Sequence, residues 1–350
     1  MSSLKNLFMS TQNQRIPSLE LGRIIAILAV ITIHCQLFVT YPLYNDTAWF
    51  GNFINQLCRF AVPYFFLLTG YVLQPKLSLN PIPTAFTYIK PLTIVWLVWS
   101  VIYLAAPFNL MTVATDGYLA ERQMYWDFLA QTPFNSILEG GLVHLWYLPA
   151  LIISIAIIAL AIRLKLSRLL LPLGLVLFIY GVLAGSYFDA TDIASPFYTR
   201  NGPFFSLLMI MLGFEIRRSE LRIGSNLAIL LTVLGLVIHF FEAFYLLSFD
   251  VDFRVHDYLF GTPIWALGFF FWLLANPNLG SHKWVQPLAN LTLGVYVSHL
   301  LFVIYLINFA GFFELGTWQK DLLVWLGSSI LSFTFTYLVM KTPLRKLLFR

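Results

Sequence analysis

The segment Glu20-Leu-Gly-Arg23-Ile-Ile-Ala-Ile-Leu-Ala-Val-Ile-Thr-Ile-His34-Cys-Gln36 is apolar enough to cross a bilayer, yet it carries a guanidinium near its start and an imidazole in its interior. Ionisable groups at that depth are costly and usually face a cavity or a pathway rather than lipid. In a helix, Arg23 and His34 are separated by roughly 16 Å along the axis and point to nearly the same face. The segment therefore predicts a membrane helix with a cation near one surface and a base deep inside. A structural alternative stays open, in which Arg23 extends to the surface and a neighbouring helix satisfies His34.

The composition is typical of a membrane protein. Of 350 residues, 59% are hydrophobic and only 11% are charged, whereas about a quarter of an ordinary soluble domain is charged. The net charge of +5 does not indicate a nucleic-acid partner, because the basic residues lie in short clusters between apolar stretches. We predict an all-α polytopic membrane protein with one transmembrane domain over residues 1–350. Within it, 1–18 is a cytoplasmic N-terminal segment, and no soluble domain is fused.

Ten apolar windows are long enough to cross a bilayer as helices. They cover residues 19–40, 53–74, 86–106, 143–162, 169–186, 202–216, 225–247, 259–275, 287–309 and 322–340. If the N-terminus is cytoplasmic, fifteen Lys and Arg residues, Lys5 and Arg350 among them, lie in cytoplasmic segments and four lie outside. Because cytoplasmic loops are enriched in Lys and Arg, this distribution predicts about ten helices with both termini in the cytoplasm. The first window has no small-residue cleavage site, so we expect it to remain as a signal anchor.

Other polar side chains lie where lipid-facing residues are expected. Arg59 lies about two turns into the second window from the outer surface, and the proline four residues later predicts a kink beside a cavity. His144 and Trp146 stand at the outer boundary of the fourth window, and His299 lies far from both ends of the ninth. A single membrane histidine is usually a packing or hydrogen-bonding residue. Several of them together with Glu242 favour a chemical role.

Glu242 follows His239 by three residues in the seventh window, so the two share one helix face and are able to satisfy each other. Another imidazole in the bundle is an equally good partner for that carboxylate. The two cysteines, Cys35 and Cys58, fall at similar depth in neighbouring windows. A disulfide is conceivable there, but two small apolar fillers are the preferred interpretation.

Several chemistries lack support in the sequence. No HExxH or other close ligand pair occurs, so no metal is predicted. Phosphate-loop and dinucleotide fingerprints are absent, and no Gly-x-Ser-x-Gly elbow is present. What remains is a membrane-embedded base with a cation some distance from it. That pair suits transfer from a cytoplasmic anionic donor to a hydroxyl that approaches from outside, with the imidazole taking the hydroxyl proton.

Four short motifs occur in order along the chain. They are Arg-x10-His at 23–34, Arg-x-x-x-Pro-x-Phe-Phe-x-x-x-Gly-Tyr at 59–71, His-Leu-Trp-Tyr-Leu at 144–148 and Leu-Gly-x-Tyr-x-x-His at 293–299. In these motifs, over nearly its whole length, the chain resembles the acyltransferase 3 family of bacterial integral membrane acyltransferases. It is most similar to stand-alone members that O-acetylate surface polysaccharides, such as enterobacterial common antigen, or their lipid-linked precursors.

This resemblance implies acetyl-CoA as acyl donor, a glycan or lipid-linked glycan as acceptor, and the bacterial inner membrane as location. It implies that His34 is the base and that Arg23 is a donor-side or structural cation. The family's Arg-x-x-Arg near the third helix is missing here, and only Lys90 stands there. Arg217, Arg218 and Arg222 are further candidates for holding the donor.

We expect Glu242 or a nearby group to orient His34. Arg59, His144, Trp146 and His299 are expected on the acceptor side. Direct transfer and an acetyl-His34 intermediate both stay open. Two other functions also stay open. One is a polysaccharide or small-solute transporter with His34 and Glu242 as a proton relay, and the other is a membrane sensor without catalysis.

Overall fold

The computed structural model describes residues 15–349, and these residues contain helices and connecting segments but no strand. Most of the predicted cytoplasmic segment 1–18 lies outside the described residues, as do Lys5 and Arg350. In chain order the helices are α2 (Pro17–His34), α3 (Trp49–Leu57), α4 (Ala61–Leu79), α5 (Pro81–Ala105), α6 (Leu110–Asp116), α7 (Tyr118–Gln131), α8 (Pro133–Glu139), η1 (Val143–Trp146), α9 (Tyr147–Arg163), η2 (Ser167–Leu169), α10 (Leu170–Leu183), α11 (Phe188–Thr191), α12 (Pro203–Arg218), α13 (Ser225–Leu246), η3 (Leu247–Phe249), α14 (Gly261–Ala275), α15 (Val285–Ala289), α16 (Thr292–Phe312), α17 (Thr317–Met340) and α18 (Arg345–Leu348).

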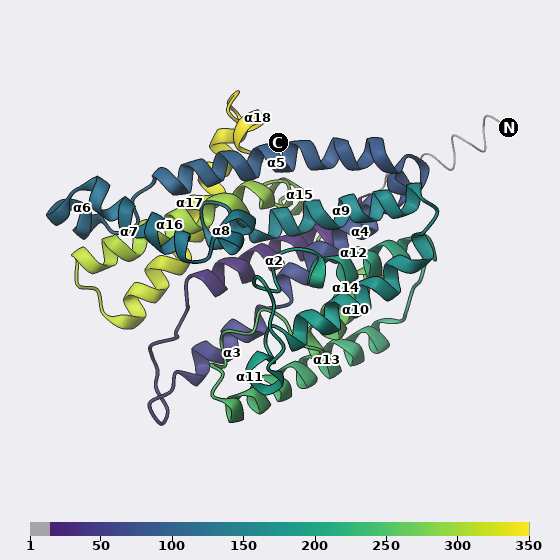
Figure 1. Ribbon diagram of the computed structural model, residues 1–350, viewed down its shortest axis with the longest axis horizontal. Coiled ribbons are helices and arrows are strands. Elements are labelled where there is room, and N and C mark those ends of the chain that lie inside the picture. The colour runs from purple at the N-terminus through teal and green to yellow at the C-terminus, as the bar shows by residue number, and fades with distance from the viewer. Residues whose placement is uncertain (1–14, 350) are drawn as a thin grey trace.

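Each of the ten predicted windows contains a helix, and the all-α polytopic fold class is confirmed. Within residues 15–349, seven stretches are long and apolar enough to cross a membrane. The windows at 169–186, 202–216 and 259–275 contain α10, α12 and α14, which have 14, 16 and 15 residues. Figure 1 shows the long helices side by side in one bundle, with the α4–α5, α9–α10 and α12–α13 connections at one end and α6 at the other. The α9–α10 connection contains Lys165 and Arg168, and the α12–α13 connection contains Arg222, three of the residues predicted to be cytoplasmic.

Two windows differ from the expected continuous helices, and both differences lie at predicted site residues. The first helix ends at His34 rather than near residue 40, and Gln36 and Phe38 then adopt positive φ. The second window is broken between α3 and α4, so that Arg59 lies in the break and Pro63 lies in the first turn of α4. Irregular backbone within a membrane is tolerated where protein or a cavity surrounds it. Both interruptions of helical backbone, after His34 and around Arg59, therefore lie at predicted site residues.

Glycines bring α4 and α12 unusually close together. A Cβ at Gly70 would lie 1.8 Å from the Ile210 carbonyl oxygen, and a Cβ at Gly213 would lie 1.9 Å from that of Leu67. Only hydrogen fits at these two positions, as at many membrane helix interfaces where small residues let backbones approach. This contact fixes Tyr71, the residue after Gly70, relative to the C-terminal end of α12.

The outer connection after α5 folds into a cap of three short helices, α6, α7 and α8. Arg122 on α7 is fully buried, its guanidinium carbon lies 4.4 Å from the Phe108 ring centroid, and it donates to Glu121. It also donates to the Tyr103 carbonyl oxygen at 3.3 Å. The cap is thereby attached to α5 at a tyrosine whose ring contacts His144.

Candidate active site

Three histidines from distant parts of the sequence meet in the bundle. His34 is the last residue of α2, His144 lies in η1, and His299 lies within α16. The ring centroids of His34 and His299 are 5.2 Å apart, those of His144 and His299 are 5.2 Å apart, and those of His34 and His144 are 6.1 Å apart. The sequence predicted His34 as a base and the other two as acceptor contacts. The structure brings them into one cluster, which we call the histidine cluster.

Backbone carbonyls of α16 hold two rings of the histidine cluster. His299 is completely buried, and its Nδ1 lies 2.6 Å from the Tyr296 carbonyl oxygen and 3.2 Å from that of Val295. The Nε2 of His144, which is also buried, lies 3.4 Å from the Val297 carbonyl oxygen. A carbonyl oxygen only accepts, so each of these nitrogens carries the proton and the other nitrogen of each ring keeps its lone pair.

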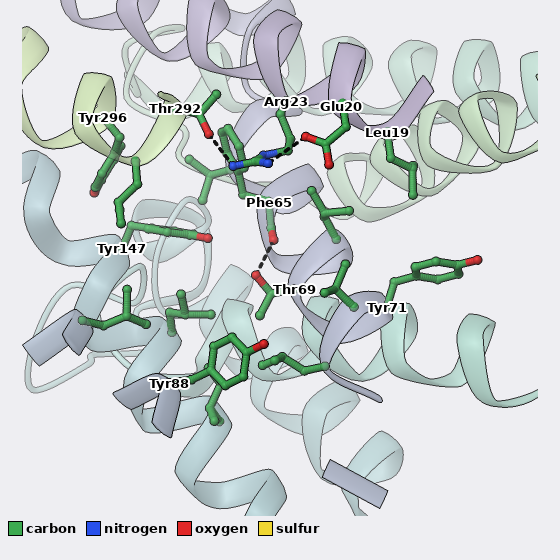
Figure 2. A pocket seen from close by; sticks show the side chains of 18 of the residues that line it. Leu19, Glu20, Arg23, Phe65, Thr69, Tyr71, Tyr88, Tyr147, Thr292 and Tyr296 are labelled. Carbon is green, nitrogen blue, oxygen red and sulfur yellow. Dashed lines mark hydrogen bonds and ion pairs between the residues drawn. The ribbon is translucent and has the colours of Figure 1, made fainter. Parts of the chain in front are cut away.

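A cavity of about 710 Å³ lies between the histidine cluster and the end of the bundle predicted to face the cytoplasm. Its walls come from α2, α4, α5, α9, α12 and α16, and Figure 2 shows Arg23, Tyr147 and Tyr296 among the side chains around it. On α2 the lining ends at Val30, one turn before His34. Tyr296 both lines the cavity and contacts the ring of His144, with 5.7 Å between ring centroids. The cavity therefore ends against the histidine cluster.

Arg23 lies on the cavity wall, as the sequence predicted for a donor-side or structural cation. It donates to a Glu20 carboxylate oxygen at 2.8 Å and to the Thr292 hydroxyl at 2.8 Å, as Figure 2 shows. These bonds connect α2 to the start of α16. Because Glu20 balances its charge, Arg23 supports the wall more than it attracts an anion.

At the mouth of the cavity, two guanidinium groups converge on one neutral oxygen. Arg217 and Arg222 each donate to the Tyr71 hydroxyl at 3.2 Å, and Arg217 also lines the cavity. Among residues 15–349, no carboxylate lies within ion-pair distance of either arginine. Lys76 also lines the cavity and adds a further positive charge to its wall. The two arginines were predicted as donor cations, but Tyr71 and Lys76 were not, because their proximity to the arginines depends on the packing of α4 against α12.

Two other predicted donor cations lie elsewhere. Arg218 pairs with Glu215 at 2.6 Å, and 54% of its side chain is exposed. Lys90 is exposed on α5 and does not line the cavity. The structure therefore leaves Arg217, and not its neighbour Arg218, at the cavity.

On the outer side of the histidine cluster, Arg59 belongs to an ion-pair network. It donates to one Asp257 carboxylate oxygen at 2.9 Å, and Arg200 donates to the other at 2.9 Å and to Glu139 at 2.6 Å. Burial opposes the charge of Asp257, but the two guanidinium groups hold its pKa below the ordinary value. The charges of this network also act on His34. Asp257, Arg200 and Glu139 were not predicted, since any of twelve outer acidic residues was an equally good partner for Arg59.

Glu242 does not join the histidine cluster. It accepts from the Tyr187 hydroxyl at 2.9 Å and from the backbone N–H groups of Phe260 and Gly261 at 3.1 and 2.8 Å. A carboxylate at a helix N-terminus satisfies unpaired N–H groups and interacts favourably with the helix dipole. These contacts assign Glu242 to the start of α14, and they do not support the expected role of orienting His34.

His239, the neighbour of Glu242 on α13, also has other partners. Its Nδ1 lies 3.0 Å from the Thr262 hydroxyl, and its Nε2 lies 2.9 Å from the Gln56 side-chain oxygen. The expected pair of His239 and Glu242 is therefore not formed. The expectation failed because partners from α3 and α14 are closer than the neighbour on the same helix.

The other residues noted in the sequence, Trp146 and the two cysteines, make packing or hydrogen-bonding contacts. Trp146 packs against Phe66, with 6.3 Å between ring centroids. Cys35 and Cys58 are free thiols, and Cys35 lies 3.3 Å from the Ser328 hydroxyl. In the part of the chain that the structure describes, no group of three or more His, Cys, Asp or Glu side chains is arranged to hold a metal ion.

Most of the chain is similar to known proteins. A model of the acyltransferase 3 family, described as an acyltransferase domain, matches residues 16–341. A serine/alanine racemase from Enterococcus gallinarum is 31% identical in an alignment of 302 positions that covers 79% of this chain and 39% of that protein. An amino-acid racemase from Enterococcus faecalis is 28% identical in an alignment of 309 positions that covers 83% of this chain and 41% of that protein. This chain thus spans about two fifths of the length of these relatives, and no solved structure matches it. Because the family model covers nearly all of the described residues, the chain belongs to the acyltransferase 3 family.

Proposed function

We propose that this protein transfers an acetyl group from cytoplasmic acetyl-CoA to a hydroxyl group at the outer face of the bacterial inner membrane. The acceptor is a surface polysaccharide or its lipid-linked precursor. One observation supports the proposal most strongly, namely the cavity that leads from the cations at its mouth to Tyr296 beside the histidine cluster. This cavity suits an elongated donor with an anionic end and a reactive end.

The mouth of the cavity suits the phosphates of coenzyme A. Arg217 and Arg222 share a single neutral acceptor, the Tyr71 hydroxyl, and no carboxylate among the described residues offsets the repulsion between their charges. A bound phosphate relieves that repulsion, and the planar guanidinium fork matches phosphate oxygens. The Arg-x-x-Arg motif on the third membrane helix is missing. In our proposal, Arg217 and Arg222 near the C-terminal end of α12 bind the coenzyme A phosphates instead.

In the proposed reaction, His34 acts as general base. The acceptor hydroxyl oxygen attacks the thioester carbonyl carbon while His34 takes the hydroxyl proton. The new C–O bond forms, the C–S bond breaks, and His34 returns the proton to the sulfur of coenzyme A. Because Tyr296 lies between the cavity and the histidines, its ring must turn aside before the thioester reaches His34. An acetyl-His34 intermediate is the variant that trapping of labelled enzyme would detect.

Arg59 is proposed to position the acceptor through the network that it forms with Asp257 and Arg200. Both guanidinium groups already bind carboxylate, so we expect them to shape the outer entrance rather than to bind an anionic group of the acceptor. His144 lies between this side and the cavity. Its ring contacts His34, His299 and Tyr296.

The contacts of Glu242 weigh against the transporter alternative. A proton relay needs His34 and Glu242 in contact or joined by polar groups, whereas both oxygens of Glu242 accept N–H groups at the start of α14. The racemase names belong to proteins more than twice as long as the matched region. We do not extend that activity to this chain, because the shared part is largely the part that matches an acyltransferase family.

The experiment that tests this function compares surface glycans from a deletion strain and its parent by mass spectrometry. The parent is expected to show acetylated glycan species that the deletion strain lacks and that the wild-type gene restores. Isotope-labelled acetyl-CoA supplied to membrane vesicles is expected to label the same species. Identical glycan profiles in the two strains, together with no labelled product, would contradict the proposal.

A further inference from the structure

The lone pair on His299 Nε2 has no hydrogen-bond partner among the described residues, although the side chain is completely buried. The Nδ1 side of the ring faces the carbonyl oxygens of its own helix. The Nε2 side therefore points away from α16, toward neighbouring groups. A buried acceptor without a donor is costly, and native proteins rarely leave one unpaired.

The ring neighbours of His299 are His34, His144 and Tyr296. Two of them have already used their donors. The Tyr296 hydroxyl donates to the His144 carbonyl oxygen, and the His144 Nε2–H faces the Val297 carbonyl oxygen. Only His34 has an N–H group left to offer, because no hydrogen bond to another described residue occupies its ring.

We infer that His299 is a positioning residue for His34, which it orients by accepting a His34 N–H at its own Nε2; this inference rests on the proposed function. Neutral imidazole carries one N–H and one lone pair. Donation of that N–H to His299 turns the other His34 nitrogen, with its lone pair, toward the acceptor hydroxyl. His299 thus performs the task that a carboxylate performs in hydrolytic triads, where the third residue fixes the tautomer and supports the imidazolium.

His144 competes for the same role, because its Nδ1 also lacks a partner among residues 15–349. Distance favours His299. Its ring centroid lies 5.2 Å from that of His34, whereas that of His144 lies 6.1 Å away. The planes of His34 and His144 are nearly perpendicular at 75°, and those of His34 and His299 are inclined at 49°.

The test compares His299→Asn and His299→Gln with wild type in membrane vesicles supplied with labelled acetyl-CoA. Asn keeps a donor near the position of Nδ1 but provides nothing at Nε2, whereas Gln extends an amide oxygen toward Nε2. We expect His299→Asn to lower kcat about 100-fold while KM for acetyl-CoA stays within about twofold. His299→Gln should recover about tenfold of that loss, because a neutral acceptor replaces part of the contact.

Two reference variants keep the test decisive. His34→Ala shows whether the base itself matters, and retained activity there would overturn both the function of His34 and this inference. His144→Gln is the matched comparison. If His34→Ala is inactive but His299→Asn keeps wild-type kcat, or if only His144→Gln lowers kcat, His299 is not the partner. A rise in KM at unchanged kcat in His299→Asn would indicate a purely structural residue and would also overturn the inference.

Discussion

The arginines at the two ends of the site have different kinds of partner. At the outer end, Arg59 and Arg200 donate to Asp257, and Arg200 also donates to Glu139. At the inner end, Arg217 and Arg222 both donate to the Tyr71 hydroxyl, and neither has a carboxylate partner among residues 15–349. Cations with carboxylate partners hold segments of the protein together, whereas cations without a carboxylate partner are available to an anionic ligand. We therefore expect the outer network to stabilise the fold and the inner cations to bind the anionic part of the proposed donor.

The outer network should contribute strongly to stability. Asp257→Asn leaves Arg59 and Arg200 with Glu139 as the single carboxylate among them. Breaking a buried ion pair costs about 3–5 kcal/mol, and the partial exposure of Asp257 reduces the expected loss to about 2–3 kcal/mol. Thermal unfolding in detergent should therefore show a clear decrease in Tm.

Asp252→Asn is the matched control for Asp257→Asn. Asp252 lies in the same loop and pairs with Arg254, but both side chains are more than a third exposed. Surface pairs contribute about 0–1 kcal/mol, so this variant should unfold close to the wild-type Tm. Equal Tm values for the two variants would show that the outer network does not hold the loops together.

Replacement of the inner cations should leave stability unchanged and weaken donor binding. Arg217→Ala combined with Arg222→Ala removes two charged contacts to phosphate, each worth about 1.5–3 kcal/mol. Because 1.4 kcal/mol corresponds to a factor of ten, we expect the Kd for coenzyme A to rise at least about tenfold. Isothermal titration calorimetry in detergent measures this change, and Tm should stay near that of the wild type.

Arg218→Ala supplies the comparison on the same helix end. Arg218 differs from Arg217 by one position and pairs with Glu215 on the surface. Its removal should leave the Kd for coenzyme A unchanged. If Arg218→Ala weakens binding as much as the double variant, the effect is one of general surface charge and not of the cavity mouth.

A smaller effect is expected from His256, a buried residue in the outer loop beside the network. Burial and the Arg59 guanidinium lower its pKa from 6.5 to about 4, although Asp257 and Asp252 act in the opposite direction. The folded protein thus binds a proton here less readily than the unfolded chain. The resulting stability is present above pH 6.5 and decreases as pH falls toward 4, by up to about 3 kcal/mol.

His256→Gln removes this contribution to the pH dependence. The decrease in Tm between pH 7.5 and pH 5 should therefore be smaller in the variant than in the wild type. Other buried histidines titrate in both proteins, so only the difference between the two is informative. The same decrease in both would show that His256 is protonated as readily in the folded protein as in the unfolded chain.

The sequence predicted much of the fold because hydropathy acts locally. Each apolar window contains a helix, and the three windows with the shortest helices still contribute α10, α12 and α14. Helix ends were harder to place. The break at Arg59 and the stop at His34 depend on surrounding protein, which compensates for irregular backbone that the linear pattern does not show.

The site was only partly predictable, because tertiary contacts build it. His34, His144 and His299 were each noticed as unusual membrane histidines, but their meeting depends on how α2, η1 and α16 pack. Glu242 was misassigned for the same reason. Its neighbours in sequence suggested a histidine partner, whereas folding brings the start of α14 to its carboxylate.

The role of His34 is best tested by acetyl transfer in vesicles from a deletion strain that carries either wild-type protein or His34→Ala at equal level. Loss of a general base typically slows a reaction by about 100- to 10,000-fold. We predict that His34→Ala binds coenzyme A with wild-type Kd but transfers labelled acetyl groups to glycan at least about 100-fold more slowly. Transfer at the wild-type rate by His34→Ala would contradict the proposed chemistry.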